Sequence, residues 1–201
     1  TRTVQELDLG NKPTKTTIDG IETESQAIDI NNNPKVEMVT SSGTIVIELF
    51  PEQSPITVRN FLSYVESGFY NNTIFHRVIP NLLIQGGAYT PNLQLKKENG
   101  FIKNEANNGL SNQRGTIAAA RRNNDSESAT SQFFFNVVDN PQFDFSSTSS
   151  MLGRGYTVFG KVIKGQEIID AMRLMPTESK GKIGDYVPKT PIIIKQAHKL
   201  D

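Results

Sequence analysis

Short apolar runs of strand length alternate with polar, glycine-containing stretches along most of this chain. Val36–Thr40 and Thr44–Leu49 are rich in β-branched residues, and the intervening Ser41-Ser42-Gly43 predicts a hairpin turn. Further runs of the same kind lie at Phe75–Val78, Leu82–Gln85, Thr116–Ala120, Phe133–Val138, Tyr156–Ile163 and Ile192–Ala197. Together these make eight predicted strands. Many short strands separated by glycine-rich turns favour a closed β-barrel.

Two segments have the spacing of helices rather than of strands. Between Pro55 and Gly68 the apolar residues recur at intervals of three and four, at Val58, Phe61, Leu62 and Val65. We expect Thr57 to cap the start of this helix and Gly68 to follow its end. A second helix is predicted over Gly165–Met172. The fold class is therefore predicted as mainly β, a closed barrel whose open ends are capped by two helices.

Residues 1–33 differ in composition from the rest of the chain. They are rich in Thr, Asp, Glu and Asn, and their scattered apolar residues follow no helical or strand period. We predict a polar N-terminal arm, either a flexible linker or a segment docked along the surface of the domain formed by residues 34–201.

Net charge and the length of apolar runs bear on whether the protein binds nucleic acids or crosses a membrane. Lys plus Arg and Asp plus Glu number 21 each, so the formal net charge is zero. This balance provides no basic surface for a nucleic acid or an anionic membrane, and we expect no nucleic-acid partner. Since no stretch approaches the roughly 18 consecutive apolar residues of a membrane span, we expect no such span.

The residue types present also limit the chemistry. The chain has no cysteine, which excludes disulfides, thiolate catalysis and cysteine-based metal sites. Its histidines, His76 and His198, are far apart, and no Asp-rich calcium loop occurs. We therefore expect neither a metal nor a cofactor. The start at Thr1 fits either a removed signal peptide or a trimmed product.

The first candidate for chemistry is the run Phe75–Pro80, followed by Ile84–Gly87. Strand alternation predicts Phe75 and Arg77 on one face and His76 on the other. An arginine among aromatic residues needs a partner or a ligand. From the residues alone, Arg77 is either a ligand-binding group or a structural residue that binds carbonyl groups at the barrel rim.

The second candidate combines Gly115–Ala120 with Ala129–Asn136. Small alanines opposite large phenylalanines create a shallow groove that a backbone could approach closely, although three successive phenylalanines could also be only core. Gln132 lies between the predicted groove and the core, and its amide offers both a donor and an acceptor to a peptide.

Taken together, these segments resemble the cyclophilin family of peptidyl-prolyl cis–trans isomerases, over about Val36 to Ala197. The resemblance is carried by Asn60-Phe61, Gly68-Phe69-Tyr70, the Phe75–Pro80 and Gln85–Gly87 runs, Ser131–Phe134 and Val158–Val162. Tyr70–Thr73, Lys103–Ala106, Asp125–Thr130 and Tyr156 are more similar to bacterial envelope members. The resemblance implies that the barrel is antiparallel, that proline-containing polypeptides are the partners and that folding is assisted. We expect a monomer in the bacterial periplasm, with a cytoplasmic location still open.

Site residues also follow from the resemblance. It implies that Arg77, Gln85 and Phe134 are catalytic, with Phe134 as the floor of the proline pocket. The substrate-binding residues would be Leu82, Leu83, Ala120, Arg121, Gln132, Gln142, Phe143 and Tyr156. The backbone near Arg121 would pair with the substrate chain. Because Gln142 occupies a position where many members have a tryptophan, whose indole N–H helps to hold the drug, cyclosporin is expected to bind with weakened affinity.

The implied reaction needs no nucleophile, proton relay or metal. Arg77 would hold the substrate carbonyl and favour the twisted state, in which the proline nitrogen becomes pyramidal and gains a lone pair. Leu82, Leu83 and Gln142 depart from the usual family residues. They motivate an alternative function, a proline-peptide-binding chaperone or scaffold with little turnover.

Overall fold

The computed structural model describes residues 15–18, 21–24 and 32–201. β1 (Lys15–Ile18) and β2 (Ile21–Glu24) pair with each other as an antiparallel hairpin, which the sequence pattern does not predict. The rest of the predicted arm, residues 1–14, 19–20 and 25–31, lies outside the described residues. The division into an arm and a domain, and the choice between a flexible and a docked arm, therefore stay predictions.

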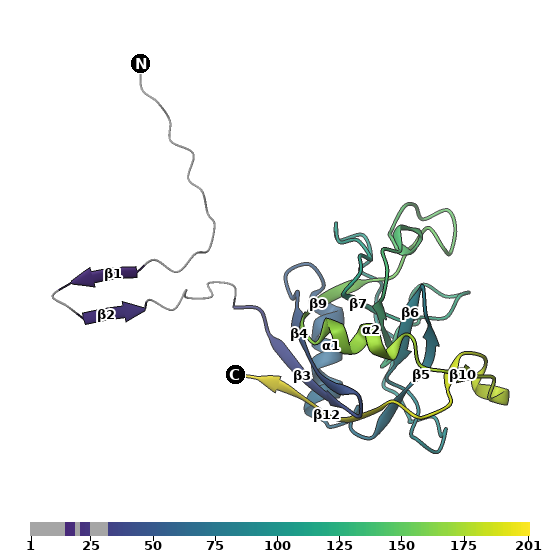
Figure 1. The fold of residues 1–201 in the computed structure, drawn as a ribbon. Helices are drawn as coiled ribbons and strands as arrows, with labels where there is room; N and C mark the ends of the chain where they lie inside the picture. Colours follow the sequence, from purple (N-terminus) through teal and green to yellow (C-terminus); the bar gives the residue numbers. More distant parts are fainter. Residues whose placement is uncertain (1–14, 19–20, 25–31) are drawn as a thin grey trace. The chain divides into compact units, whose positions relative to one another are not determined.

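Eight strands of the described residues close into an antiparallel barrel, in the order β12-β3-β4-β9-β7-β8-β6-β5 (Figure 1). The strands are β3 (Lys35–Thr40), β4 (Gly43–Leu49), β5 (Thr73–Ile79), β6 (Leu83–Gly86), β7 (Thr116–Ala119), β8 (Phe133–Asn136), β9 (Val158–Lys164) and β12 (Ile193–Leu200). Each predicted run overlaps one of them. The predicted antiparallel barrel is thus confirmed.

Alternation along the strands sends every second side chain into the barrel. In β3, Val36 and Met38 are fully buried, whereas the residues between them are partly exposed. In β8, Phe133 and Phe135 belong to the main hydrophobic core, but Phe134 belongs to a second, smaller cluster. The three successive phenylalanines therefore serve two different faces of the barrel wall. This split creates an apolar floor on the outside of the barrel.

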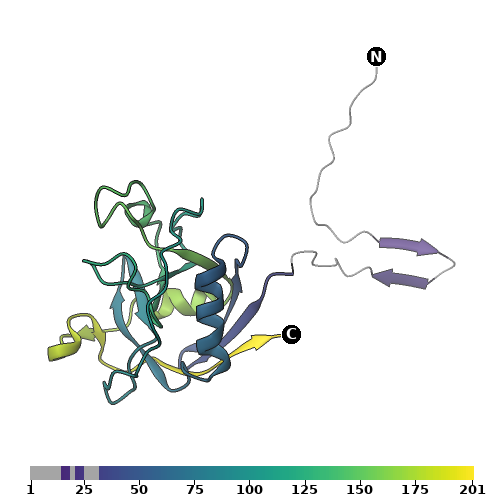
Figure 2. The same cartoon turned by 180° about the vertical axis from the view of Figure 1, so that it is seen from behind.

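The two helices lie on opposite sides of the barrel. α2 (Gln166–Met172) is in front in Figure 1, and α1 (Pro55–Glu66) is in front in the reverse view of Figure 2. The expected cap of α1 at Thr57 is wrong. Ser54 is the N-cap residue, with Pro55 at the first helical position, where proline is favoured because its missing N–H needs no partner.

Thr57 instead lies in the first turn of α1, where a loop carboxylate supplies the cap. Glu105 accepts hydrogen bonds from the backbone N–H of Ile56 (3.1 Å) and Thr57 (2.8 Å) and from the Thr57 hydroxyl (2.7 Å). The other end agrees with the prediction. Gly68 follows the helix with φ +70°, and its N–H donates to the carbonyl of Val65.

Besides the β1–β2 hairpin, the described residues contain four short elements that the sequence does not predict. They are η1 (Pro141–Phe143), β10 (Thr177–Glu178), η2 (Gly181–Ile183) and β11 (Val187–Pro188). β10 and β11 pair with each other. In the part of the chain that the structure describes, neither helix has the length and apolar character that crossing a membrane would require.

Candidate active site

A β-bulge in β5 sets the direction of Arg77. The pairing of β5 with β6 shifts between Phe75 and Arg77, so that Phe75 pairs with Gly86 and Arg77 with Gln85. Phe75 and Val78 both enter the main core, which regular alternation would forbid for residues three apart. The predicted placement of Phe75 and Arg77 on one face is therefore wrong. The bulge turns Arg77 outward and leaves it exposed.

Cross-strand pairing places a row of candidate site residues across one part of the barrel wall. Gln85 of β6 pairs with Arg77 on one side and with Phe134 of β8 on the other. Phe134 in turn pairs with Ala118 of β7. Because directly paired residues on antiparallel strands lie side by side, the strands fix the order arginine, glutamine, phenylalanine and alanine.

Side-chain hydrogen bonds link Arg77 and Gln85 of this row to a third polar residue, Gln132. Gln85 Nε2 donates to Gln132 Oε1 at 2.9 Å, and Arg77 Nη1 makes a longer contact of 3.4 Å with Gln85 Oε1. Gln85 therefore connects the other two side chains and orients both. Gln132 is also held through its main chain, because its carbonyl accepts from the N–H of Ala120 at 3.0 Å.

Gln132 is fixed further by buried contacts on its N-terminal side. The hydroxyl of Tyr70 donates to the carbonyl of Ser131 at 2.7 Å, and the Ser131 hydroxyl donates to the carbonyl of Gly87 at 2.6 Å. Gly87 has φ +92°, and a Cβ there would lie 2.8 Å from the Ser131 carbonyl oxygen. Only glycine satisfies both constraints. Burial also raises the pKa of Tyr70 well above its usual value, so this donor stays protonated.

Arg77 and Gln85 also border a cavity of about 270 Å³ that combines polar and apolar residues. Its residues are Arg77, Leu82, Leu83, Gln85, Ala120, Arg121, Asn123, Phe134, Phe143 and Tyr156. Three aromatic rings meet edge to face in its lining. The ring centroid of Phe134 lies 5.7 Å from those of Phe143 and Tyr156, and the centroids of Phe143 and Tyr156 are 5.1 Å apart. Phe134 is only 2% exposed and forms the floor.

Arg121 is bound by the protein through its side chain. Its guanidinium donates to the carbonyls of Gly155 (3.0 Å), Arg122 (3.1 Å) and Met151 (2.6 Å) and lies over the Tyr156 ring, 4.4 Å from its centroid. Arg121 therefore braces the aromatic wall with its side chain. This leaves its backbone, rather than its guanidinium, as the part that would meet a substrate.

A second cavity, of about 240 Å³, adjoins the first. Gln85, Ala120 and Arg121 line both cavities, and Gln132 lines the second. The second cavity also includes Tyr89, Leu95, Glu98, Phe101, Arg122, Ser128 and Thr130, none of which the sequence reasoning singled out. Among the described residues, no group of three or more His, Asp or Glu side chains is placed to hold a metal ion.

The combination of an exposed arginine, two glutamines and an aromatic-floored pocket on a closed barrel can be compared with known proteins. Residues 35–199 match the family model described as cyclophilin type peptidyl-prolyl cis-trans isomerase. The chain belongs to the cyclophilin family.

Similar cyclophilins come from several bacteria. A peptidyl-prolyl cis-trans isomerase of Acinetobacter baylyi is 51% identical over 162 residues, covering 81% of this chain and 83% of that protein. Peptidyl-prolyl cis-trans isomerase B of Escherichia coli is 49% identical over 156 residues, covering 78% and 93%. The crystal structure of a Cryptosporidium parvum cyclophilin in the presence of the dipeptide Ala-Pro superimposes with a TM-score of 0.69 at 30% identity, covering 83% of this chain and 99% of that one. The predicted family and enzyme class are confirmed: the protein is a peptidyl-prolyl cis–trans isomerase.

Of the predicted site residues in this cyclophilin, Gln142 is the one that lies outside both cavities. It is exposed in η1, and its Nε2 donates to Asn140 Oδ1 at 3.0 Å. The next residue, Phe143, lines the cavity instead. The structure brings the other predicted residues together around the two adjoining cavities.

Sequence reasoning also gave His76 no role. His76 is 6% exposed, packs against Tyr89 with ring centroids 4.8 Å apart, and has no partner for its buried Nδ1. Burial, and secondarily the charge of Arg77, lower its pKa to about 4. The imidazole beside Arg77 is therefore neutral near pH 7 and adds no positive charge next to the guanidinium.

Proposed function

We propose that Arg77, Gln85 and Phe134 catalyse the rotation of X–Pro bonds in this isomerase, in proline-containing segments of polypeptides. The observation that carries this proposal is the hydrogen-bonded group of Arg77, Gln85 and Gln132 directly beside a cavity with an aromatic floor. One side of such a site suits the peptide amide, and the other suits the pyrrolidine ring.

The obstacle in this reaction is the loss of amide resonance. The barrier to rotation is about 18–20 kcal/mol, and the uncatalysed X–Pro exchange takes tens to hundreds of seconds. In the twisted transition state the proline nitrogen becomes pyramidal and its lone pair is exposed. A donor that bonds this nitrogen, or holds the neighbouring carbonyl in its rotated position, lowers the barrier because it binds the transition state better than the planar ground state.

Arg77 meets this requirement. A guanidinium stays protonated and presents several N–H donors in a fixed plane, so one donor can hold a carbonyl while another reaches the proline nitrogen. Its contact with Gln85 Oε1 orients that plane, and the bond from Gln85 to Gln132 fixes the orientation of Gln85. Since these donors are placed before the substrate arrives, little reorganisation accompanies the reaction.

Phe134 and the residues around it would hold the proline ring. The ring would rest on Phe134, between Leu83 and Phe143, and keep its place while the preceding carbonyl rotates. The backbone at Ala120 and Arg121 borders both cavities, and we assign it the pairing with the substrate main chain. A fixed ring and a mobile carbonyl are the geometry that isomerisation requires.

A protease-coupled assay with a proline-containing tetrapeptide tests this assignment. Arg77→Ala should lower kcat/KM by about 100-fold, as expected for the loss of one transition-state donor. Arg77→Lys keeps the charge but not the planar pair of donors, and should recover only part of the rate. Arg59→Ala, which removes an exposed arginine from α1, serves as the control. Retention of most of the activity in Arg77→Ala would refute the assignment.

We also propose the bacterial periplasm as the compartment, and a monomer that assists the folding of unfolded proteins there. The resemblance of Tyr70–Thr73, Lys103–Ala106 and Asp125–Thr130 to bacterial envelope members supports this location, and the lack of cysteine is compatible with it. Osmotic-shock fractionation of cells that produce the tagged native gene product tests the location, and recovery in the cytosolic fraction would contradict it. Light scattering of the purified protein measures its mass in solution, and a mass of twice that of one chain would contradict the monomer.

A further inference from the structure

Three asparagines form a buried hydrogen-bonded chain next to the proposed proline pocket. Asn112, Asn136 and Asn140 are each at most 1% exposed, although asparagine is seldom fully buried unless its amide is paired. Asn140 Nδ2 donates to Asn136 Oδ1 (2.8 Å), Asn136 Nδ2 to Asn112 Oδ1 (3.1 Å), and Asn112 Nδ2 to Asp144 Oδ1 (3.0 Å). We call these three asparagines with Asp144 the amide relay.

The amide relay holds the main chain of the pocket walls. Asn140 Nδ2 donates to the carbonyl of Leu82 at 2.9 Å, and the carbonyl of Asn140 accepts from the N–H of Phe143 at 2.9 Å. Asn112 Nδ2 also contacts the carbonyl of Tyr156 at 3.3 Å. Three apolar wall residues are thus tied through their backbones to a relay whose own side chains stay outside the cavity.

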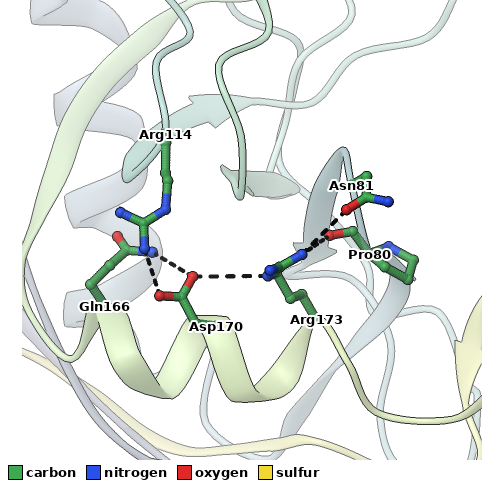
Figure 3. Close-up of polar contacts among 6 residues, drawn as sticks. All are labelled: Pro80, Asn81, Arg114, Gln166, Asp170 and Arg173. Carbon is green, nitrogen blue, oxygen red and sulfur yellow. Dashed lines mark hydrogen bonds and ion pairs between the residues drawn. The ribbon is translucent and has the colours of Figure 1, made fainter.

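The turn between β5 and β6 is also bonded by a residue that follows α2. Arg173, just after α2, donates through Nη1 to the carbonyl of Pro80 at 2.8 Å and to Asn81 Oδ1 at 3.3 Å (Figure 3). Asp170 lies 4.0 Å from Arg173 Nε and also pairs with Arg114 at 2.5 Å. The turn that leads into Leu82 is therefore bonded by Arg173 before Leu82 and by Asn140 at Leu82.

The walls need such support because they are not part of the regular sheet. The floor of the cavity, Phe134 and Leu83, belongs to strands whose ladders fix it. Leu82 lies in the turn before β6, and Phe143 lies in a three-residue 3-10 segment. Main-chain bonds outside any ladder hold these segments, from the Leu82 N–H to the Ile79 carbonyl (3.0 Å) and from the Tyr156 N–H to the Phe143 carbonyl (2.8 Å). The Asn140 amide adds a side-chain bond to the Leu82 carbonyl.

We propose that Asn140 and Arg173 are positioning residues for proline binding, which hold Leu82 and, through Asn140, Phe143 at the spacing that a pyrrolidine ring requires. This rests on the proposed location of the proline pocket. The walls contact the ring equally in the planar and twisted states. Their displacement therefore weakens substrate binding and leaves the chemical step intact, in contrast to the loss of Arg77.

The kinetic test compares Asn140→Ala, Arg173→Ala and the double variant. We expect KM for a proline tetrapeptide to rise about tenfold in Asn140→Ala, and less in Arg173→Ala, with kcat within about twofold of the wild type. Because both residues hold one turn, their effects on KM should be non-additive. Asn71→Ala removes an asparagine that accepts from the Ala197 N–H on β12, and Arg114→Ala removes the other arginine of Asp170. Both controls should leave KM unchanged.

Methyl NMR of Leu82 and Leu83 separates this proposal from the proposed pocket itself. Addition of an Ala-Pro peptide should shift both leucines in the wild type, and an absence of any shift would overturn the location of the pocket. In Asn140→Ala the Leu82 methyl signals should already differ without peptide. If the wild-type leucines respond but both variants keep wild-type KM while losing stability like Asn71→Ala, the positioning role is refuted. Should Asn140→Ala not fold, Arg173→Ala, on a partly exposed side chain, decides alone.

Discussion

Acidification should destabilise this cyclophilin through one buried histidine. His76 has a folded-state pKa of about 4 against 6.5 for an ordinary histidine, because burial disfavours its charged form and Arg77 adds to that effect. Its Nδ1 has no hydrogen-bond partner among the described residues. As the pH falls, the unfolded chain therefore takes up a proton at this residue before the folded protein does.

The sign and size follow from proton linkage. Above pH 6.5 the imidazole is neutral in both states and contributes no pH dependence. Between pH 6.5 and pH 4 only the unfolded state is protonated, so stability falls by about 1.4 kcal/mol per pH unit. The loss from His76 alone reaches about 2 kcal/mol at pH 5 and about 3 kcal/mol at pH 4, and levels off below that. This is a large part of the roughly 5–15 kcal/mol that stabilises an ordinary domain.

Urea unfolding of wild type and His76→Gln at pH 7, 6, 5 and 4.5 measures this contribution. Glutamine does not titrate, and all other groups are shared, so the difference in unfolding free energy between the two proteins isolates His76. We expect that difference to move in favour of His76→Gln by about 2 kcal/mol from pH 7 to pH 5. Proton NMR of the two histidines, with His198→Gln to assign the signals, reports the pKa directly. A difference in stability that does not change with pH, or a His76 signal that titrates near pH 6.5, would refute the reasoning.

Three further predictions concern a glycine beside the site, the cap of α1 and the affinity for cyclosporin. Gly87→Ala should cost at least about 1–2 kcal/mol for its positive φ alone and also lower kcat/KM, because the new Cβ displaces Ser131 and with it Gln132. Urea unfolding and the peptide assay measure both, and Gly100→Ala, with no heavy atom within 4 Å of the new Cβ, should change neither. Glu105→Ala should lower stability by about 1–2 kcal/mol by uncapping α1, with Glu105→Gln intermediate, and equal stability of all three proteins in urea would contradict the cap. Gln142→Trp should tighten cyclosporin inhibition about fivefold to tenfold, equivalent to roughly 1 kcal/mol for one added N–H donor, and unchanged inhibition would show that the missing indole is not what weakens binding.

The barrel could be predicted from the sequence because β-strand alternation and turn residues are local signals. The position of Arg77 could not be derived in the same way. The Phe75–Val78 run contains no glycine or other local signal of a β-bulge. Strict alternation therefore predicts Arg77 on the same face as Phe75, which is wrong. The cap of α1 was misassigned although Ser54-Pro55 carries the usual signal of a cap followed by proline at the first helical position. The contact of Glu105 with Thr57 spans 48 residues and has no local signature.

The amide relay shows a similar limit. Asn112 and Asn136 are 24 residues apart, and Asn140 reaches Leu82 across 58 residues, so polar residues that would ordinarily be assigned to loops are in fact fully buried. Matching to the family placed both Gln142 and Phe143 at the pocket, but the η1 segment presents only Phe143 to the cavity and leaves Gln142 exposed. Local patterns specify strands and helices, whereas the walls of this site depend on long-range hydrogen bonds.

The residues to which we assign catalysis and those to which we assign affinity stand on different kinds of backbone. Arg77, Gln85 and Phe134 stand on paired strands, and any change that moves them also disturbs the barrel. Leu82 and Phe143 stand on a turn and a 3-10 segment, held from outside by Asn140 and Arg173. With the roles proposed above, we expect substitutions in the walls to alter which proline segments bind while the proposed donors keep their places. Leu82 and Gln142, which depart from the family pattern, lie in these adjustable segments rather than in the row that carries Arg77. Leu83, which also departs from that pattern, is fixed by the ladders of β6.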